Sequence, residues 1–133
     1  MFKVKSDFMG SFKVGDNINH NLRILSLFYG FQSNSIEEKK ILLCKPIIIT
    51  LTSICEAILW DLHMRITNHT IEGVRNIAQS VINMIRSKKI DEFEKYIASA
   101  KKNDFFDVKD SQIYKDLDTL RKLNQFYITC LNL

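Results

Sequence analysis

The chain has 133 residues, of which 46% are hydrophobic and 26% charged, with a net charge of +4 and a sequence pI of about 9.0. These values are typical of one globular domain and leave no room for a second domain of ordinary size. One Pro and four Gly favour long helices over many short strands and tight turns. The mild basicity permits contact with nucleic acid without requiring it.

The N-terminal third predicts an arm and two helices. Residues 1–17 carry no long apolar stretch of the kind that a secretory signal has, and we expect a loosely structured arm. A helix is predicted from Asn19 to Phe28, ended by Gly30 and the polar residues after it. Its apolar face would hold Leu22, Leu25 and Phe28. Asn34 or Ser35 is expected to cap a short helix that covers residues 37–43.

A long central helix is predicted over residues 46–67, with Pro46 in its first turn, where a missing N–H costs nothing. Its apolar stripes comprise Ile47, Leu51, Ile54, Ile58 and Leu62, with Ile48, Cys55, Leu59 and Ile66 beside them. A face this wide predicts contact with at least two neighbours. The most apolar run, residues 47–59, contains Thr50 and Glu56, and it is too short and too polar to be expected to span a bilayer.

Three further helices are predicted after a turn at residues 68–70. The first runs to about Arg86. The second starts near Asp91, with Glu94 as its capping partner, has Phe93, Ile97 and Ala100 on its inner face, and ends at residues 101–103. The last starts at Asp110 or Ser111, and its stripe holds Ile113, Leu117, Leu120, Asn124, Tyr127 and Leu131.

These elements predict one all-α domain over residues 1–133. We expect an up-and-down bundle of four main helices, with one or two short helices before them. The sequence shows no internal repeat, no low-complexity tract and no linker to a second domain.

The common catalytic motifs are missing from the sequence. It contains no Gly-x-Ser-x-Gly nucleophile motif and no Gly-rich phosphate loop. The His and Cys residues lack metal-binding spacing, so we expect neither a metal nor a cofactor. Cys44, Cys55 and Cys130 form an odd set without a signal peptide. They are interpreted as inert thiols in a reducing cytoplasm.

Two groups of polar residues lie on the central helix. Glu56, Trp60 and His63 fall at i, i+4 and i+7 and would form either a polar site beside an aromatic ring or a boundary stripe between core and solvent. Arg65 and His69 are one turn apart. They could hold a phosphate and move a proton, or they could be two cations that favour the helix C-terminus.

Basic residues cluster in the second half of the chain. They are Arg86, Lys88, Lys89, Lys95, Lys101, Lys102, Arg121 and Lys122. If these side chains converged, they would create a groove that contacts phosphates. The strongest candidates for such contacts are Arg121, Lys122, Arg86, Lys88 and Lys89. The alternative is an ordinary solvated surface.

Three segments in order resemble the HEPN superfamily, in particular its bacterial RiboL-PSP-HEPN-like members. The segments are 45–62, 89–97 and 114–123, and the similarity covers about residues 20–123. The resemblance implies an up-and-down helical bundle that usually dimerises. Many such proteins are metal-independent ribonucleases of toxin–antitoxin, abortive-infection or other defence systems, and others bind RNA or act as scaffolds without catalysis.

The catalytic pattern that the resemblance implies is not present. In active members an Arg, a polar residue and three to five further residues precede a His in the last helix. Here Arg121 is followed by Lys122-Leu123 and then by residues 124–133, which contain no His. The sequence therefore suggests either a gene truncated or frame-shifted near codon 124 or a non-catalytic version. Arg121 is expected to retain at most a phosphate contact.

The resulting hypothesis is a catalytically degenerate HEPN-like protein that acts in the cytoplasm through RNA or protein association. We expect no membrane contact. A homodimer is predicted from the apolar side chains of the last helix, namely Phe126, Tyr127, Ile128 and Leu131. An antitoxin or another protein is a further candidate partner. The alternatives are a ribonuclease with an unusual site at Arg65 and His69 or at His63, and a purely structural interaction module.

Overall fold

The computed structural model of the chain describes residues 12–68, 79–86, 92–106 and 112–129. These residues form five helices and no strand, which confirms the all-α prediction. The helices are α1 (Phe12–Ser33), α2 (Glu37–Asn68), α3 (Gln79–Arg86), α4 (Phe93–Asn103) and α5 (Gln112–Thr129).

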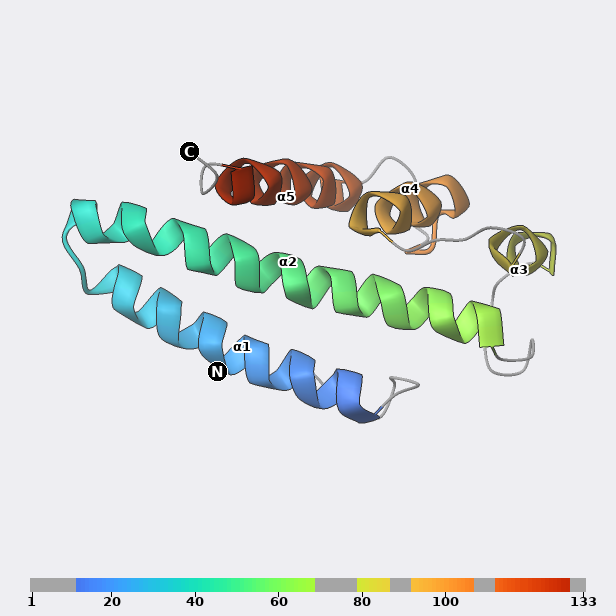
Figure 1. Cartoon of the computed structure of the whole chain (residues 1–133), viewed down its shortest axis with the longest axis horizontal. Coiled ribbons are helices and arrows are strands. Elements are labelled where there is room, and N and C mark those ends of the chain that lie inside the picture. Colours follow the sequence, from blue (N-terminus) through green and yellow to red (C-terminus); the bar gives the residue numbers. More distant parts are fainter. Residues whose placement is uncertain (1–11, 69–78, 87–91, 107–111, 130–133) are drawn as a thin grey trace.

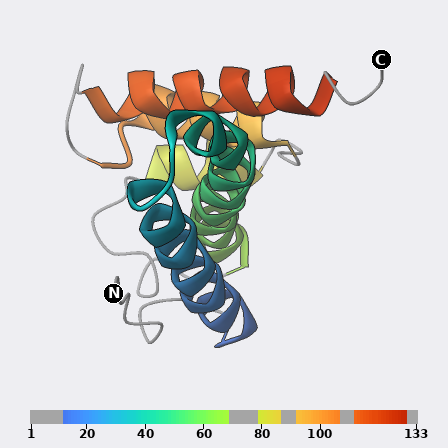
Figure 2. The same ribbon diagram turned by 90° about the vertical axis from the view of Figure 1, so that its left-hand side faces the viewer.

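The long helix α2 lies between two layers of helices. Helix α1 runs antiparallel to it on one side, and α4 and α5 cover the other side (Figure 1). Helix α3 lies near the C-terminal end of α2 (Figure 1). Figure 2 shows the hairpin of α1 and α2 end-on, with α5 crossing above it. The prediction that the central helix contacts at least two neighbours is confirmed.

Two separate hydrophobic clusters lie on the two sides of α2. The α1–α2 cluster contains Ile18, Leu22, Leu25, Ile47 and Ile54. The second cluster, between α2, α4 and α5, contains Leu59, Phe93, Tyr96, Ile97, Ala100, Tyr114 and Leu117. The helical spacing of apolar residues along α2 turns part of its wide face toward each cluster. The described residues therefore form two small cores that share α2.

Helix α1 is longer than the sequence predicted. It begins at Phe12, so residues 12–17 are helical and only residues 1–11 of the predicted arm lie outside the described residues. Val14 and Ile18 extend the apolar face of Leu22 by two turns and pack in the α1–α2 cluster. The helix also continues through Gly30. A Gly inside a helix costs only about 1 kcal/mol.

The predicted break between a short helix and the central helix is wrong, because α2 is continuous and contains Pro46. A Pro inside a helix removes the hydrogen bond to the carbonyl four residues earlier, here that of Leu42. Leu42 is 70% exposed, so water can hydrate this carbonyl. The predicted caps bond backward to α1 instead: Asn34 Nδ2 donates to Gly30 O at 3.0 Å, and Ser35 Oγ donates to Phe31 O at 2.6 Å.

A tight turn after α4 fixes the start of α5. Asp104 adopts a left-handed conformation with φ 48°, a common way to end a helix. Tyr114 Oη donates to Asp104 Oδ1 at 2.9 Å and accepts the Phe106 N–H at 3.3 Å. This buries Tyr114, while Ile113 stays 42% exposed. The prediction that Ile113 faces inward is therefore wrong, because its neighbour Tyr114 does so. Leu117 is buried as predicted.

One segment of the described residues, Glu37–Ile66, is long and apolar enough to cross a membrane. It is longer than the run of residues 47–59 considered in the sequence, because α2 begins earlier than predicted. Within the chain, 17% of its most apolar stretch is buried. The core helix of a water-exposed domain can meet the same length and composition test, so the absence of membrane contact stays a prediction.

Candidate functional site

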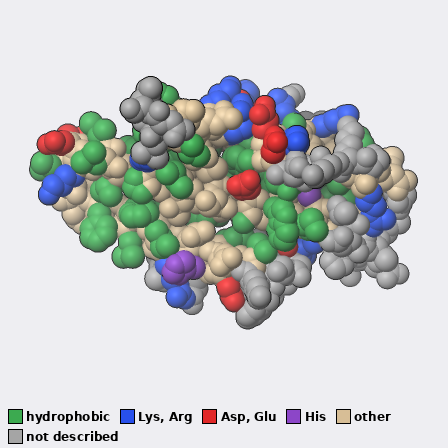
Figure 3. Space-filling view, viewed as in Figure 1, with side chains coloured by type: hydrophobic (Ala, Val, Ile, Leu, Met, Phe, Trp, Pro, Cys, Tyr) green, Lys and Arg blue, Asp and Glu red, His purple; other side chains and the backbone are tan. Residues whose placement is uncertain are grey.

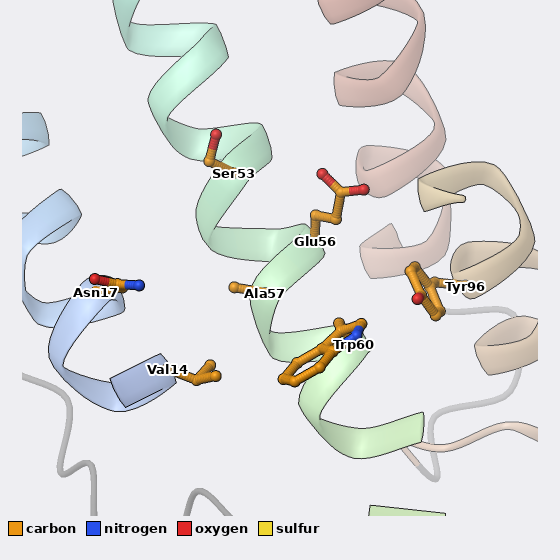
Figure 4. A pocket seen from close by; sticks show the side chains of 7 residues that line it. All are labelled: Val14, Asn17, Ser53, Glu56, Ala57, Trp60 and Tyr96. Atoms are coloured by element: carbon orange, nitrogen blue, oxygen red, sulfur yellow. The ribbon is translucent and has the colours of Figure 1, made fainter. Parts of the chain in front are cut away.

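A groove of about 490 Å³ lies between α1, α2 and α4. It is lined by Val14, Asn17, Ser53, Glu56, Ala57, Trp60 and Tyr96. Figure 4 shows the Trp60 ring between Val14 of α1 and Tyr96 of α4, with Glu56 one turn earlier on α2. The groove is therefore a candidate ligand site.

The helical repeat of α2 brings Glu56 and Trp60 to the same side of the groove. Glu56 is half-buried, and no described residue forms a hydrogen bond or an ion pair with its carboxylate. Trp60 is 37% exposed, whereas Tyr96 is 5% exposed and belongs to the α2–α4–α5 cluster. Glu56 and Trp60, which the sequence placed on one flank of the central helix, both line the groove, together with Tyr96 of α4.

His63, the third member of that proposed site, lies in the core instead. It is 3% exposed, and its ring centroid is 5.0 Å from that of Tyr96 and 5.2 Å from that of Phe105. Nδ1 lies 2.7 Å from the carbonyl oxygen of Leu59, which can only accept, so this nitrogen carries the hydrogen. Burial lowers the pKa of His63, and the hydrogen bond to Leu59 opposes part of this effect.

The lowered pKa of His63 makes stability depend on pH. The unfolded chain binds a proton here at about pH 6.5, whereas the folded chain binds it only at lower pH. Stability should therefore fall as the pH drops below about 6.5 and level off below the folded pKa. Thermal melts of the wild type and His63→Phe between pH 7 and 5 should show a smaller pH dependence in the variant. His20→Gln, at an exposed histidine, serves as the control and should melt like the wild type.

Arg65, proposed as a phosphate clamp, is engaged by its own helix. Its Nε donates to Asp61 Oδ2 at 2.9 Å, and the two side chains are 24% and 7% exposed. Arg65 Nη2 is buried without a hydrogen-bond partner among the described residues. His69 lies outside the described residues. The proposed pairing of Arg65 with His69 therefore stays a prediction.

Arg121 is also held within the chain. Its side chain is 16% exposed; Nη2 lies 2.9 Å from Asp118 Oδ1, and Nη1 lies 3.5 Å from Glu94 Oε2. Lys122 Nζ lies 2.7 Å from Asp118 Oδ2. Hydrogen bonds from Lys122 and then from Arg121 lower the pKa of Asp118. A phosphate at Arg121 would have to compete with two carboxylates.

The other proposed phosphate contacts lie elsewhere. Arg86 Nε donates to the carbonyl oxygen of Ile66 at 3.0 Å and so ties α3 to the end of α2. Lys88 and Lys89 fall outside the described residues. The structure thus brings Arg121 and Lys122 together on α5 and does not place Arg86 with them (Figure 1).

The described residues contain no group of three His, Cys, Asp or Glu side chains that could hold a metal ion. Cys44 and Cys55 are half-buried free thiols. Burial raises the pKa of Cys55, which makes it a poor nucleophile. Cys130 lies outside the described residues.

Sequence reasoning missed most of the residues that line the groove. Val14 and Asn17 fell in the predicted arm, and Tyr96 was not assigned to any face. The only available signal was the spacing of Val14 and Ile18 ahead of Leu22, which continues the apolar face of α1. No protein-family model matches this chain, and neither a curated protein nor a solved structure matches it.

Proposed function

We propose that this chain is a non-catalytic, HEPN-like association module that works as a homodimer in the cytoplasm. The observation that carries the proposal is a set of large apolar side chains exposed around the end of the α1–α2 hairpin. This hairpin-end surface consists of Leu27, Phe31, Ile36, Ile41 and Leu42, which are 61–70% exposed. Figure 3 shows hydrophobic side chains gathered over this end of the molecule.

The charges beside the hairpin-end surface fit a second copy of the chain. Glu37 and Glu38 are followed directly by Lys39 and Lys40, and Lys40 Nζ lies 2.7 Å from Glu37 Oε1. In a two-fold dimer each surface meets its own copy, so a surface that carries both signs of charge can pair with itself. An anionic bilayer would instead favour a surface with basic residues alone.

Three of the predicted phosphate contacts support protein association more than RNA binding. Arg121, Lys122 and Arg86 all bond to groups within the chain. RNA binding that weakens with salt would nevertheless support the RNA-associating form of the hypothesis. Metal-independent RNA cleavage in EDTA, lost in both Arg65→Ala and His69→Ala, would instead support the ribonuclease alternative.

The substitution Leu42→Asp should raise the dissociation constant of the homodimer by at least about tenfold, because a two-fold interface would contain the buried carboxylate twice. Sedimentation equilibrium over a range of protein concentrations measures this constant. Ile113→Asp places the same charge at a residue that is 42% exposed on α5, away from the hairpin end, and should leave the dimer intact.

Two results would redirect the proposal. A wild-type chain that stays monomeric at every concentration would contradict self-association, and flotation with lipid vesicles would then test the membrane alternative. Dissociation by Phe126→Asp but not by Leu42→Asp would move the interface to α5. Phe126 and Ile128 are 60% and 48% exposed there, and the sequence predicted this helix as the dimer contact.

A further inference from the structure

We propose that the groove between α1, α2 and α4 binds an aliphatic organic cation, with Glu56 as the counter-charge, the exposed Trp60 ring as the main aromatic wall and the edge of the buried Tyr96 behind it. This site is separate from the hairpin-end surface, since none of the five residues of that surface lines the groove. The proposal therefore does not depend on the proposed dimer.

Charge selects the class of ligand. Among the described residues that line the groove, Glu56 is the only charged one, and it lies in a chain whose net charge is +4. Its half-buried carboxylate has no ion-pair or hydrogen-bond partner among the described residues. A partly desolvated carboxylate gains most from a bound cation. An anion would be repelled.

The aromatic rings favour an organic cation over a metal ion. Ammonium and guanidinium groups are attracted to the faces of Trp and Tyr rings, with Trp the stronger partner. Figure 4 shows the rings of Trp60 and Tyr96 on the same side of α2 as Glu56. A hard metal ion would need several oxygen ligands, and within the part of the groove that the structure describes Glu56 supplies the only carboxylate.

The remaining lining residues suit an aliphatic stem. Val14 and Ala57 give the groove an apolar wall between α1 and α2. Asn17 and Ser53 are exposed and lie toward the solvent, where they could bond a polar group at the far end of the ligand. A lysine or arginine side chain of a partner protein and a free aliphatic amine both have this chemistry.

The chain provides its own reporter, because Trp60 is its only tryptophan. Titration with pentylammonium should give a saturable change in tryptophan emission, and 1-pentanol at the same concentrations should not. The substitution Glu56→Gln keeps the shape of the side chain and removes its charge, so it should weaken pentylammonium binding about tenfold. Glu38→Gln removes a charge from an exposed position on the same helix and should leave binding unchanged.

A second variant guards against indirect effects of Glu56→Gln. Ser53→Phe places a ring at the exposed side of the groove and should abolish binding while the thermal melt stays that of a folded chain. The tripeptide acetyl-Gly-Lys-Gly-amide separates the two sources of cation. Tighter binding of this peptide than of pentylammonium assigns the groove to a lysine of a partner protein, and weaker binding assigns it to a free amine. Equal responses to pentylammonium and 1-pentanol, or unchanged binding in Glu56→Gln, would overturn the proposal.

Discussion

Replacement of Leu59 by Ala should lower the free energy of unfolding by about 3 kcal/mol. Leu59 is 1% exposed and packs at the centre of the α2–α4–α5 cluster, so its truncation leaves a cavity between three helices. Urea unfolding followed by far-UV circular dichroism, at one fixed protein concentration, measures this loss.

The control for Leu59→Ala is Ile113→Ala. Ile113 is 42% exposed on α5, and a surface truncation of this kind usually changes stability by less than about 0.5 kcal/mol. A loss of unfolding free energy in Leu59→Ala no larger than in Ile113→Ala would contradict the packing of α4 and α5 on α2 around Leu59.

Removal of the buried carboxylate in Asp61→Ala should destabilise the chain by about 2–3 kcal/mol. Loss of one partner from a buried ion pair costs more than the pair itself contributes, because the other charge stays in a site of low polarity. Here the Arg65 side chain is 24% exposed, and its Nη2 is already buried and unpartnered among the described residues. Because part of Arg65 is exposed, water can still hydrate its charge, and the expected loss of stability is smaller than for a fully buried ion pair.

A double-mutant cycle tests this explanation. Arg65→Met should be milder than Asp61→Ala, and the combination of both should cost less than the sum of the two, since no uncompensated charge remains. Additive losses would show that Asp61 stabilises the chain through groups other than Arg65.

Helical periodicity predicted which residues share a face, and the structure confirms this for several elements. Leu22 and Leu25 are buried together, as are Ile97 and Ala100. The wide apolar face of α2 correctly indicated neighbours on two sides. These features depend only on the spacing of residues along one helix, which the sequence displays directly.

Features that depend on contacts between helices could not be predicted in this way. Pro46 indicated a helix start, but α2 is continuous through it and packs against other helices along its length. Ile113 and Tyr114 are adjacent and both apolar, and the hydrogen bond from Tyr114 to Asp104 decides which one turns inward. This bond requires the left-handed turn after α4, which no local pattern indicated.

The candidate site also combines features set by one helix with features set by contacts between helices. Glu56 and Trp60 were paired from their spacing alone. Tyr96 and Val14 join them only because α4 and α1 approach α2 from either side. Conversely, His63 had the right spacing for the same site but lies on the face of α2 that meets Tyr96 and Phe105.

The division of the interior into two clusters has a consequence for cooperativity. Among the described helices, α1 makes its main contacts with α2 alone. The opposite core, around Leu59 and Tyr114, contains no α1 residue whose side chain the structure describes. Helix α1 can therefore detach in a sub-global opening that leaves the rest folded, at a free-energy cost set by the α1–α2 cluster. Because Val14 and Asn17 form one wall of the groove, any occupant that touches them would hold this helix closed.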